Sequence, residues 1–119
     1  MKISAFYVLA CCAGLAAQAS ADCEIPTLIT AIPDGATATE QELLAVQTEI
    51  QAYVAAMDDY IACQNEELTV NGSDASAEYL FLMTTRIETA RNEVDKIASD
   101  FNDQVTAFRA AREAATTFR

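Results

Sequence analysis

The stretch TEQELLAVQTEIQAYVAAMDDYI, residues 39–61, decides the fold class. Its apolar residues recur at alternating spacings of three and four, the period of an amphipathic helix with a near-heptad seam. The seam positions are Leu43, Val46, Ile50, Tyr53/Val54, Met57 and Tyr60/Ile61. Thr39 and Glu42 match a capping box, so we expect the helix to begin at Thr39. It should run to about residue 67, before the Asn71-Gly72 turn.

A longer apolar stripe follows this turn and predicts a second helix over residues 74–117. Its seam positions are Leu80, Met83, Ile87, Ala90, Val94, Ile97, Phe101, Val105, Phe108, Ala111, Ala115 and Phe118. No glycine or proline occurs after Gly72, so nothing in the sequence interrupts this helix. A short turn between two long amphipathic helices predicts an all-α fold, an antiparallel and coiled-coil-like hairpin.

The segment before the first helix, residues 22–38, does not have a helical pattern. Pro26 and Pro33 favour extended geometry in the residues that precede them. Pro33-Asp34-Gly35 is typical of a turn. We therefore expect an extended N-terminal arm that ends in a turn just before the hairpin.

Residues 1–21 have the layout of a secretory signal peptide. A single charge at Lys2 precedes an apolar run over residues 3–17, and Ala19-Ser20-Ala21 provides a small-residue cleavage site. The apolar run is short for a membrane span. We expect export with cleavage after Ala21 and no stable membrane anchor afterwards. Attachment of a lipid at Cys11 is the alternative, although it would need an unusually short apolar region.

Cleavage after Ala21 leaves 98 of the 119 residues and two of the four cysteines, Cys23 and Cys63. An even pair in a small exported chain predicts one disulfide. The disulfide would close a loop of about 40 residues. Because it restricts the unfolded chain, it should stabilise the protein by about 4 kcal/mol. Two free or intermolecular thiols remain the alternative. The bridge requires the arm to fold back along the hairpin, so four of its side chains should cover part of the seam. These are Ile25, Leu28, Ile29 and Ile32.

The net charge of −11 is unevenly distributed. Residues 22–85 contain twelve acidic residues and no Lys or Arg, whereas residues 86–119 contain six of each sign. An acidic protein repels phosphate backbones and anionic lipid surfaces, so we expect neither a nucleic acid partner nor adsorption to such membranes.

The residue inventory argues against catalysis. The chain has no histidine, which excludes nucleophile systems that depend on one and removes the commonest metal ligand. Asp58-Asp59 and Glu66-Glu67 are adjacent pairs that diverge on a helix, so we expect solvated faces and no metal or cofactor site. Asn71-Gly72-Ser73 matches the N-glycosylation triplet, but the turn already accounts for these residues.

The unequal helix lengths predict a candidate partner site. At 1.5 Å per residue the first helix would be about 42 Å long and the second about 65 Å, an overhang of about 15 residues over 105–119. This segment carries Val105, Phe108, Arg109, Arg112 and Phe118. Aromatic residues and arginine are enriched at protein interfaces, so we expect a homodimer or a hetero-complex to form there. A frayed C-terminus is the alternative.

Several of these features together resemble a family. Cys23, the segment Ile32-Pro33-Asp34-Gly35-Ala36-Thr37-Ala38-Thr39, the helix face from Gln47 to Tyr53, and Cys63 are similar to small exported bacterial proteins of unknown function. In those proteins a Pro-Asp-Gly-x-x-Ala segment precedes a helix that ends near a cysteine. The resemblance covers residues 23–63, implies a periplasmic or secreted helical protein, and supplies no catalytic residues.

The sequence as a whole predicts an exported structural or protein-interaction protein of the cell envelope, without catalytic activity. The rival hypothesis is a holdase-like periplasmic chaperone that grips unfolded clients between its helices. Self-association would distinguish the two hypotheses. A structural protein that pairs with itself hides its apolar seam, whereas a chaperone must leave an apolar surface open.

Overall fold

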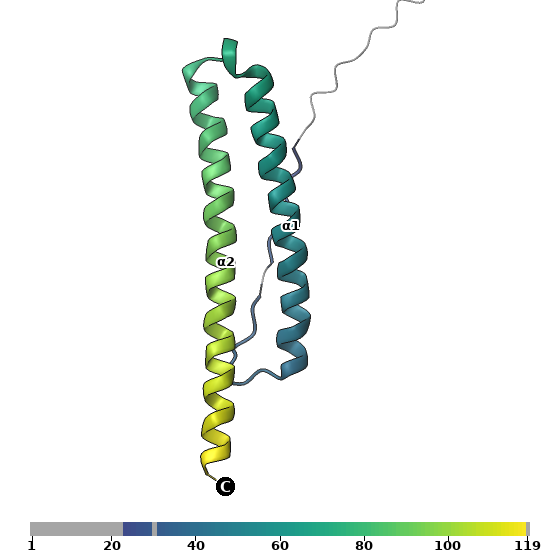
Figure 1. Ribbon diagram of the computed structural model, residues 1–119, viewed down its shortest axis with the longest axis vertical. Helices are drawn as coiled ribbons and strands as arrows, with labels where there is room; N and C mark the ends of the chain where they lie inside the picture. Colours follow the sequence, from purple (N-terminus) through teal and green to yellow (C-terminus); the bar gives the residue numbers. More distant parts are fainter. Residues whose placement is uncertain (1–22, 30, 119) are drawn as a thin grey trace, which may run out of the picture.

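The computed structural model describes residues 23–29 and 31–118, and these form an all-helical two-helix hairpin. Helix α1 spans Glu40–Asn71, a single 3₁₀ turn η1 spans Gly72–Asp74, and α2 spans Ala77–Thr117. The two long helices lie side by side and antiparallel (Figure 1). The predicted signal peptide and the lipid alternative at Cys11 lie outside the described residues.

The predicted cap at the start of α1 is confirmed. The Thr39 hydroxyl accepts a hydrogen bond from the Glu42 backbone N–H at 3.2 Å, and the Thr39 N–H donates to Glu42 Oε2 at 2.7 Å. Helix α2 begins in a similar way, because Ser76 Oγ accepts from the Tyr79 N–H at 3.2 Å. Each cap supplies a partner for backbone donors that the first helical turn leaves unpaired.

The turn between the helices lies later than predicted. Helix α1 ends at Asn71 instead of residue 67, and α2 begins at Ala77 instead of residue 74. Gly72 adopts right-handed helical angles, φ −68° and ψ −29°, so the Asn71-Gly72 pair continues the helical path into η1. The extended residues Ala75 and Ser76 then reverse the chain. The first helix is therefore longer, and the second shorter, than the sequence predicted.

The core follows the predicted seam, although Leu80 and Phe118 are exposed. Its buried apolar residues come from both helices and are Leu43, Ile50, Tyr53, Met57, Tyr60, Met83, Ile87, Ala90 and Ile97. Val46, Val54, Ile61, Val94 and Phe101 pack against this core and are half-buried. One polar residue, Gln64, occupies a buried seam position on α1 and was not predicted there.

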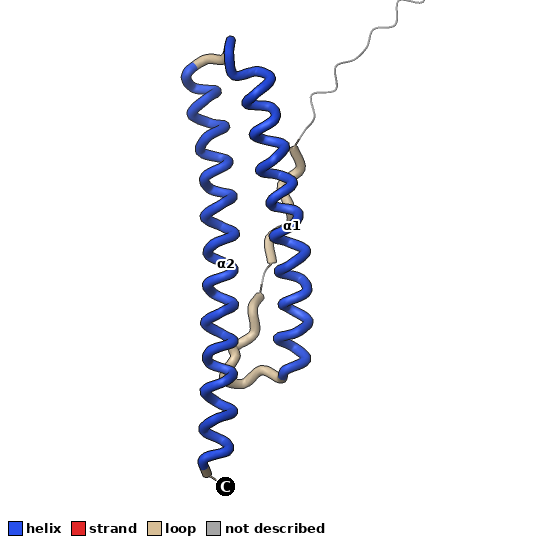
Figure 2. Tube along the Cα trace, viewed as in Figure 1, coloured by secondary structure: helices blue, strands red, loops and turns tan. Residues whose placement is uncertain are grey.

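The arm runs back along the hairpin, as the disulfide requires (Figure 2). Cys23 and Cys63 are bonded, with their Cα atoms 5.7 Å apart. Cys23, Ile29 and Ile32 pack against the helical core, so the arm forms a thin third layer. Ile25 and Leu28, also predicted to cover the seam, are exposed. In an extended chain neighbouring side chains point to opposite sides, so the inward Ile29 turns Leu28 outward.

Candidate functional site

The candidate site lies at the open end of the hairpin, where α1 begins and α2 ends. Helix α2 has 41 residues and α1 has 32, so α2 is longer by nine residues, about 14 Å, and it extends past the start of α1 at this end (Figure 1). The predicted overhang of about 15 residues was too long, because both helix ends at the turn differ from their predicted positions. The portion that truly extends beyond α1 follows Arg112.

The turn at the end of the arm reaches α2 next to the start of the predicted overhang. The Gly35 N–H donates to Gln104 Oε1 at 2.8 Å, and a Cβ on Gly35 would lie 1.8 Å from the Gln104 carbonyl oxygen. Only a residue without a side chain permits this approach. Asp34 shapes the turn: its carbonyl accepts from the Ala38 N–H at 2.8 Å, and its carboxylate accepts from the Ala36 N–H at 2.9 Å. The turn therefore lies against the backbone of α2 from Gln104 to Phe108.

An apolar groove separates the first turn of α1 from the last third of α2. Its apolar lining consists of Leu43, Leu44, Phe101, Val105 and Phe108, and its polar lining includes Glu40, Gln47, Asn102, Arg109, Arg112 and Glu113. Val105 and Phe108 are half-buried, while Leu44 is exposed. We call this feature the open-end groove. It has an apolar floor and charged edges, which is the usual composition of a protein-contact surface.

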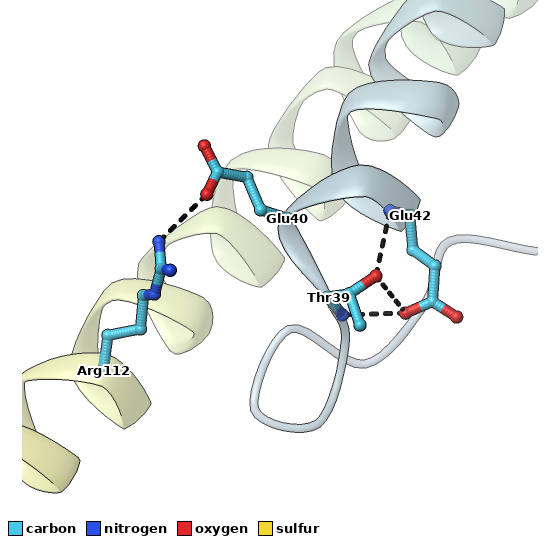
Figure 3. A network of polar contacts seen from close by, with 4 residues as sticks. All are labelled: Thr39, Glu40, Glu42 and Arg112. Carbon is cyan, nitrogen blue, oxygen red and sulfur yellow. Dashed lines mark hydrogen bonds and ion pairs between the residues drawn. The ribbon is translucent and has the colours of Figure 1, made fainter.

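A polar network fixes one edge of the open-end groove (Figure 3). Arg112 Nη1 lies 3.1 Å from Glu40 Oε2, and the Arg112 guanidinium carbon lies 4.9 Å from the centre of the Phe108 ring. Both charged side chains are well exposed, so the ion pair contributes little to stability. Its effect is positional: it holds a cation over the aromatic ring at the entrance of the groove.

The structure brings four of the five predicted partner-binding residues together. Val105, Phe108, Arg109 and Arg112 all line the open-end groove. Phe118 does not line it: this residue lies just past the end of α2 and is 91% exposed. The site therefore consists of a groove with a separate, projecting aromatic side chain beyond it.

Sequence reasoning missed an apolar surface at the other end of the hairpin. Val70, Leu80, Phe81 and Leu82 are all exposed there, and Phe81 is 75% exposed. We call these four residues the closed-end patch. A signal for it existed in the sequence, since residues 79–83 read Tyr-Leu-Phe-Leu-Met. Five consecutive apolar residues exceed the single stripe that one seam can bury.

The tyrosines behave as the packing interpretation predicted. Tyr53 and Tyr60 are buried in the core, and Tyr79 is half-buried. Burial raises the pKa of Tyr53, and the negative charge of Glu93 raises it further, so the phenol is neutral at physiological pH.

The described residues contain no group of three or more histidine, cysteine or acidic side chains placed to hold a metal ion. Asp58, Asp59 and Glu66 are exposed and Glu67 is half-buried, as solvated faces would be. Neither helix in the described part of the chain is long and apolar enough to cross a membrane.

Comparison with known proteins adds no relative. No protein-family model matches the sequence, and no curated protein or solved structure is significantly similar to it. The resemblance to small exported bacterial proteins therefore stays a prediction.

Proposed function

We propose that this chain is an exported, non-catalytic protein of the cell envelope that acts by binding another polypeptide at the open-end groove. The observation that carries this proposal is the groove's combination of an apolar floor, formed partly by Val105 and Phe108, with arginines at its edge. Phe118 projects beyond it with 91% of its surface in solvent. Exposed aromatics next to arginine are typical of binding surfaces and costly to leave in water.

The expected cellular compartment supports this proposal. The Cys23–Cys63 disulfide is consistent with an oxidising environment, where such bonds persist. The signal-peptide pattern over residues 1–21 leads to the same compartment by an independent route. Periplasmic or secreted protein is the localisation that both features favour. A hairpin tethered by a covalent bond keeps its surface fixed, which suits a structural or docking role.

Photo-crosslinking in living cells tests the proposal. A photoreactive amino acid replaces Phe118 in the full chain, expressed with its own leader, and Ala55 is replaced in a matched control. Ala55 is exposed halfway along α1, away from both ends of the hairpin. We expect a discrete crosslinked product from position 118 and none from position 55. No product from either position, or equal products from both, would contradict the proposal.

The holdase-like chaperone is the second candidate, and the exposed closed-end patch is the observation that favours it. A holdase suppresses the aggregation of a denatured client, whereas a docking protein with a specific partner does not. We expect the purified exported protein, in molar excess, to leave the light scattering of a chemically reduced, aggregating client unchanged. Suppression that Phe81→Asp abolishes would favour the chaperone instead.

A further inference from the structure

The closed-end patch is a second apolar surface that the hairpin itself does not cover. Leu80, Phe81 and Leu82 are consecutive, so their side chains spread over about 200° of the circumference of α2. Val70, which is 71% exposed, extends the patch onto α1. No single intrachain partner could cover residues that point in so many directions.

The charges around the patch are mostly negative, and the exception is Arg86, which lies one helical turn after Leu82. The acidic side chains near it are Glu66, Glu67, Asp74 and Glu78, and the chain has no Lys or Arg between residues 22 and 85. At the open end, by contrast, Arg109 and Arg112 lie beside Phe108. Each end of the hairpin thus offers an exposed aromatic. Acidic residues predominate around the closed-end patch, whereas the open end carries Arg109 and Arg112 together with Glu40 and Glu113.

We propose that the occupant of both surfaces is a second copy of this chain, paired antiparallel, so that the closed-end patch of each copy meets the open end of the other. This inference rests on the proposed function and identifies its partner. In such a pair Phe81 of one copy lies near Phe118 and the arginines of the other. A twofold axis repeats the same contact at both ends.

The exposed apolar area supports a pairing that uses both ends of the hairpin. The four side chains of the closed-end patch expose roughly 400 Å². A stable interface buries about 800 Å² on each partner, so one end alone is too small. Because a twofold pair engages the patch and the open end of every copy, two contacts form, and together they approach the required area.

Charge argues against two other arrangements. A parallel pair would place two acidic closed ends together, which costs energy through like-charge repulsion. Insertion of the patch into an anionic bilayer would bring four carboxylates towards negatively charged lipid headgroups. Antiparallel pairing instead places acidic residues opposite Arg109 and Arg112.

Distance measurements between spin labels test the orientation. Helix α2 has 41 residues, so two labels at its two ends are about 60 Å apart. With exported Thr117→Cys protein labelled at that position, we expect a distance of about 60 Å between copies. When labelled Ala77→Cys protein is mixed with labelled Thr117→Cys protein, a short distance of roughly one helix diameter, about 10 Å between backbones, should appear. A short distance within the Thr117→Cys sample alone would show parallel pairing and overturn the inference.

Sedimentation of the exported protein tests whether Phe81 and Phe118 stabilise the dimer. We expect a dimer whose dissociation constant rises at least tenfold with Phe81→Asp and with Phe118→Asp. Ala55→Asp is the matched control, because it adds the same charge at an exposed site away from both ends. Both phenylalanines are exposed, so the helical content measured by circular dichroism should stay the same in every variant.

Three results would overturn antiparallel pairing. One is a strict monomer at every accessible concentration, and another is a dimer that neither phenylalanine variant weakens. The third is Phe81-dependent binding to vesicles of zwitterionic lipid by a monomeric protein. Experiments can distinguish a failure of antiparallel pairing from a failure of the proposed function. A monomer that still crosslinks to a different protein from position 118 retains the open-end groove as a binding site and loses only the second copy as its partner.

Discussion

At the scale of single residues, Gly35 joins the arm to α2 because it has no side chain. Its φ is not positive, so the requirement is space and not backbone conformation. A Cβ there would overlap the Gln104 carbonyl oxygen and come within 3.0 Å of the Phe108 nitrogen. Both obstacles are backbone atoms of a helix, which cannot move aside as a flexible side chain can.

Gly35→Ala should therefore destabilise the protein. We expect the free energy of unfolding to fall by about 1–3 kcal/mol, as for other overpacked sites. Gly72→Ala is the matched control: its Cβ would have 3.9 Å to the nearest atoms and its φ is already helical. That change should be neutral or stabilising by up to about 1 kcal/mol. Urea denaturation of both variants measures the difference, and equal effects would refute the close-approach argument.

Gln64 is a second residue whose role depends on its surroundings. It is 3% exposed, and its Oε1 has no hydrogen-bond partner within the described residues. A buried acceptor without a partner loses its hydration and gains nothing in return. Gln64→Met keeps the length of the side chain and removes the orphan oxygen.

We expect Gln64→Met to raise the free energy of unfolding by about 1 kcal/mol. The matched control is Gln51→Met, at an exposed position of the same helix, which should change stability by less than about 0.5 kcal/mol. Thermal and urea denaturation measure both. A loss of stability in Gln64→Met would mean that the amide has a partner in solution and that this account of Gln64 is wrong.

At the scale of elements, the helices were predictable because their information is local. The seam spacing and the Thr39–Glu42 capping box specify where α1 begins and which face it buries, and the structure agrees at both. The end of α1 was not predictable from Asn71-Gly72, since both residues adopt helical angles here and continue the chain into η1. Gln64 and Gly35 were missed because their environment comes from residues distant in sequence.

The cap should make stability depend on pH. The Thr39 backbone N–H, and then its hydroxyl, both donate to Glu42 and hold the pKa of that carboxyl below its ordinary value. A lowered pKa in the folded state stabilises the fold above the pKa of the unfolded chain, near 4.5. This contribution disappears as the pH falls through the lowered value.

Glu42→Gln tests that dependence. We expect the variant to be less stable than the parent at pH 7, and the difference to shrink steadily below about pH 4.5, as the parent's carboxyl takes up its proton. Urea denaturation between pH 3 and pH 7 measures it. Glu49→Gln, exposed farther along α1, is the control and should show no such convergence. A constant difference at all pH values would contradict the cap.

The disulfide binds the arm to the hairpin at one end, and Gly35 anchors it at the other. Cys63→Ser should destabilise the protein by about 4 kcal/mol, because the bond closes a loop with a sequence separation of 40. The arm should also become sensitive to protease between residues 23 and 29, while the hairpin remains protected. Limited proteolysis followed by mass spectrometry measures this. An arm as resistant in Cys63→Ser as in the parent would show that packing alone holds it.

At the scale of the whole molecule, the candidate site stays a prediction, and the structure shows which of its residues lie together. Four residues that the difference in helix length singled out, Val105, Phe108, Arg109 and Arg112, line one groove near the C-terminal end of α2. The extent was wrong, because small errors at the turn add up and because the Asp34 turn returns to α2. No local pattern contains that return, which depends on the covalent link far away.

The central claim is that the open end of this hairpin is a contact surface and not a frayed terminus. Hydrogen–deuterium exchange of the purified protein, measured at low and high protein concentration, tests it most directly. We predict that amides of residues 105–117 exchange slowly, and that those of 113–117 gain protection as concentration rises, while Ala55 in the middle of α1 does not change. The claim would be contradicted if the amides of residues 113–117 exchanged at the rate of an unfolded peptide at every protein concentration. The same rapid exchange would have to persist when an extract of the cells that make the protein is added.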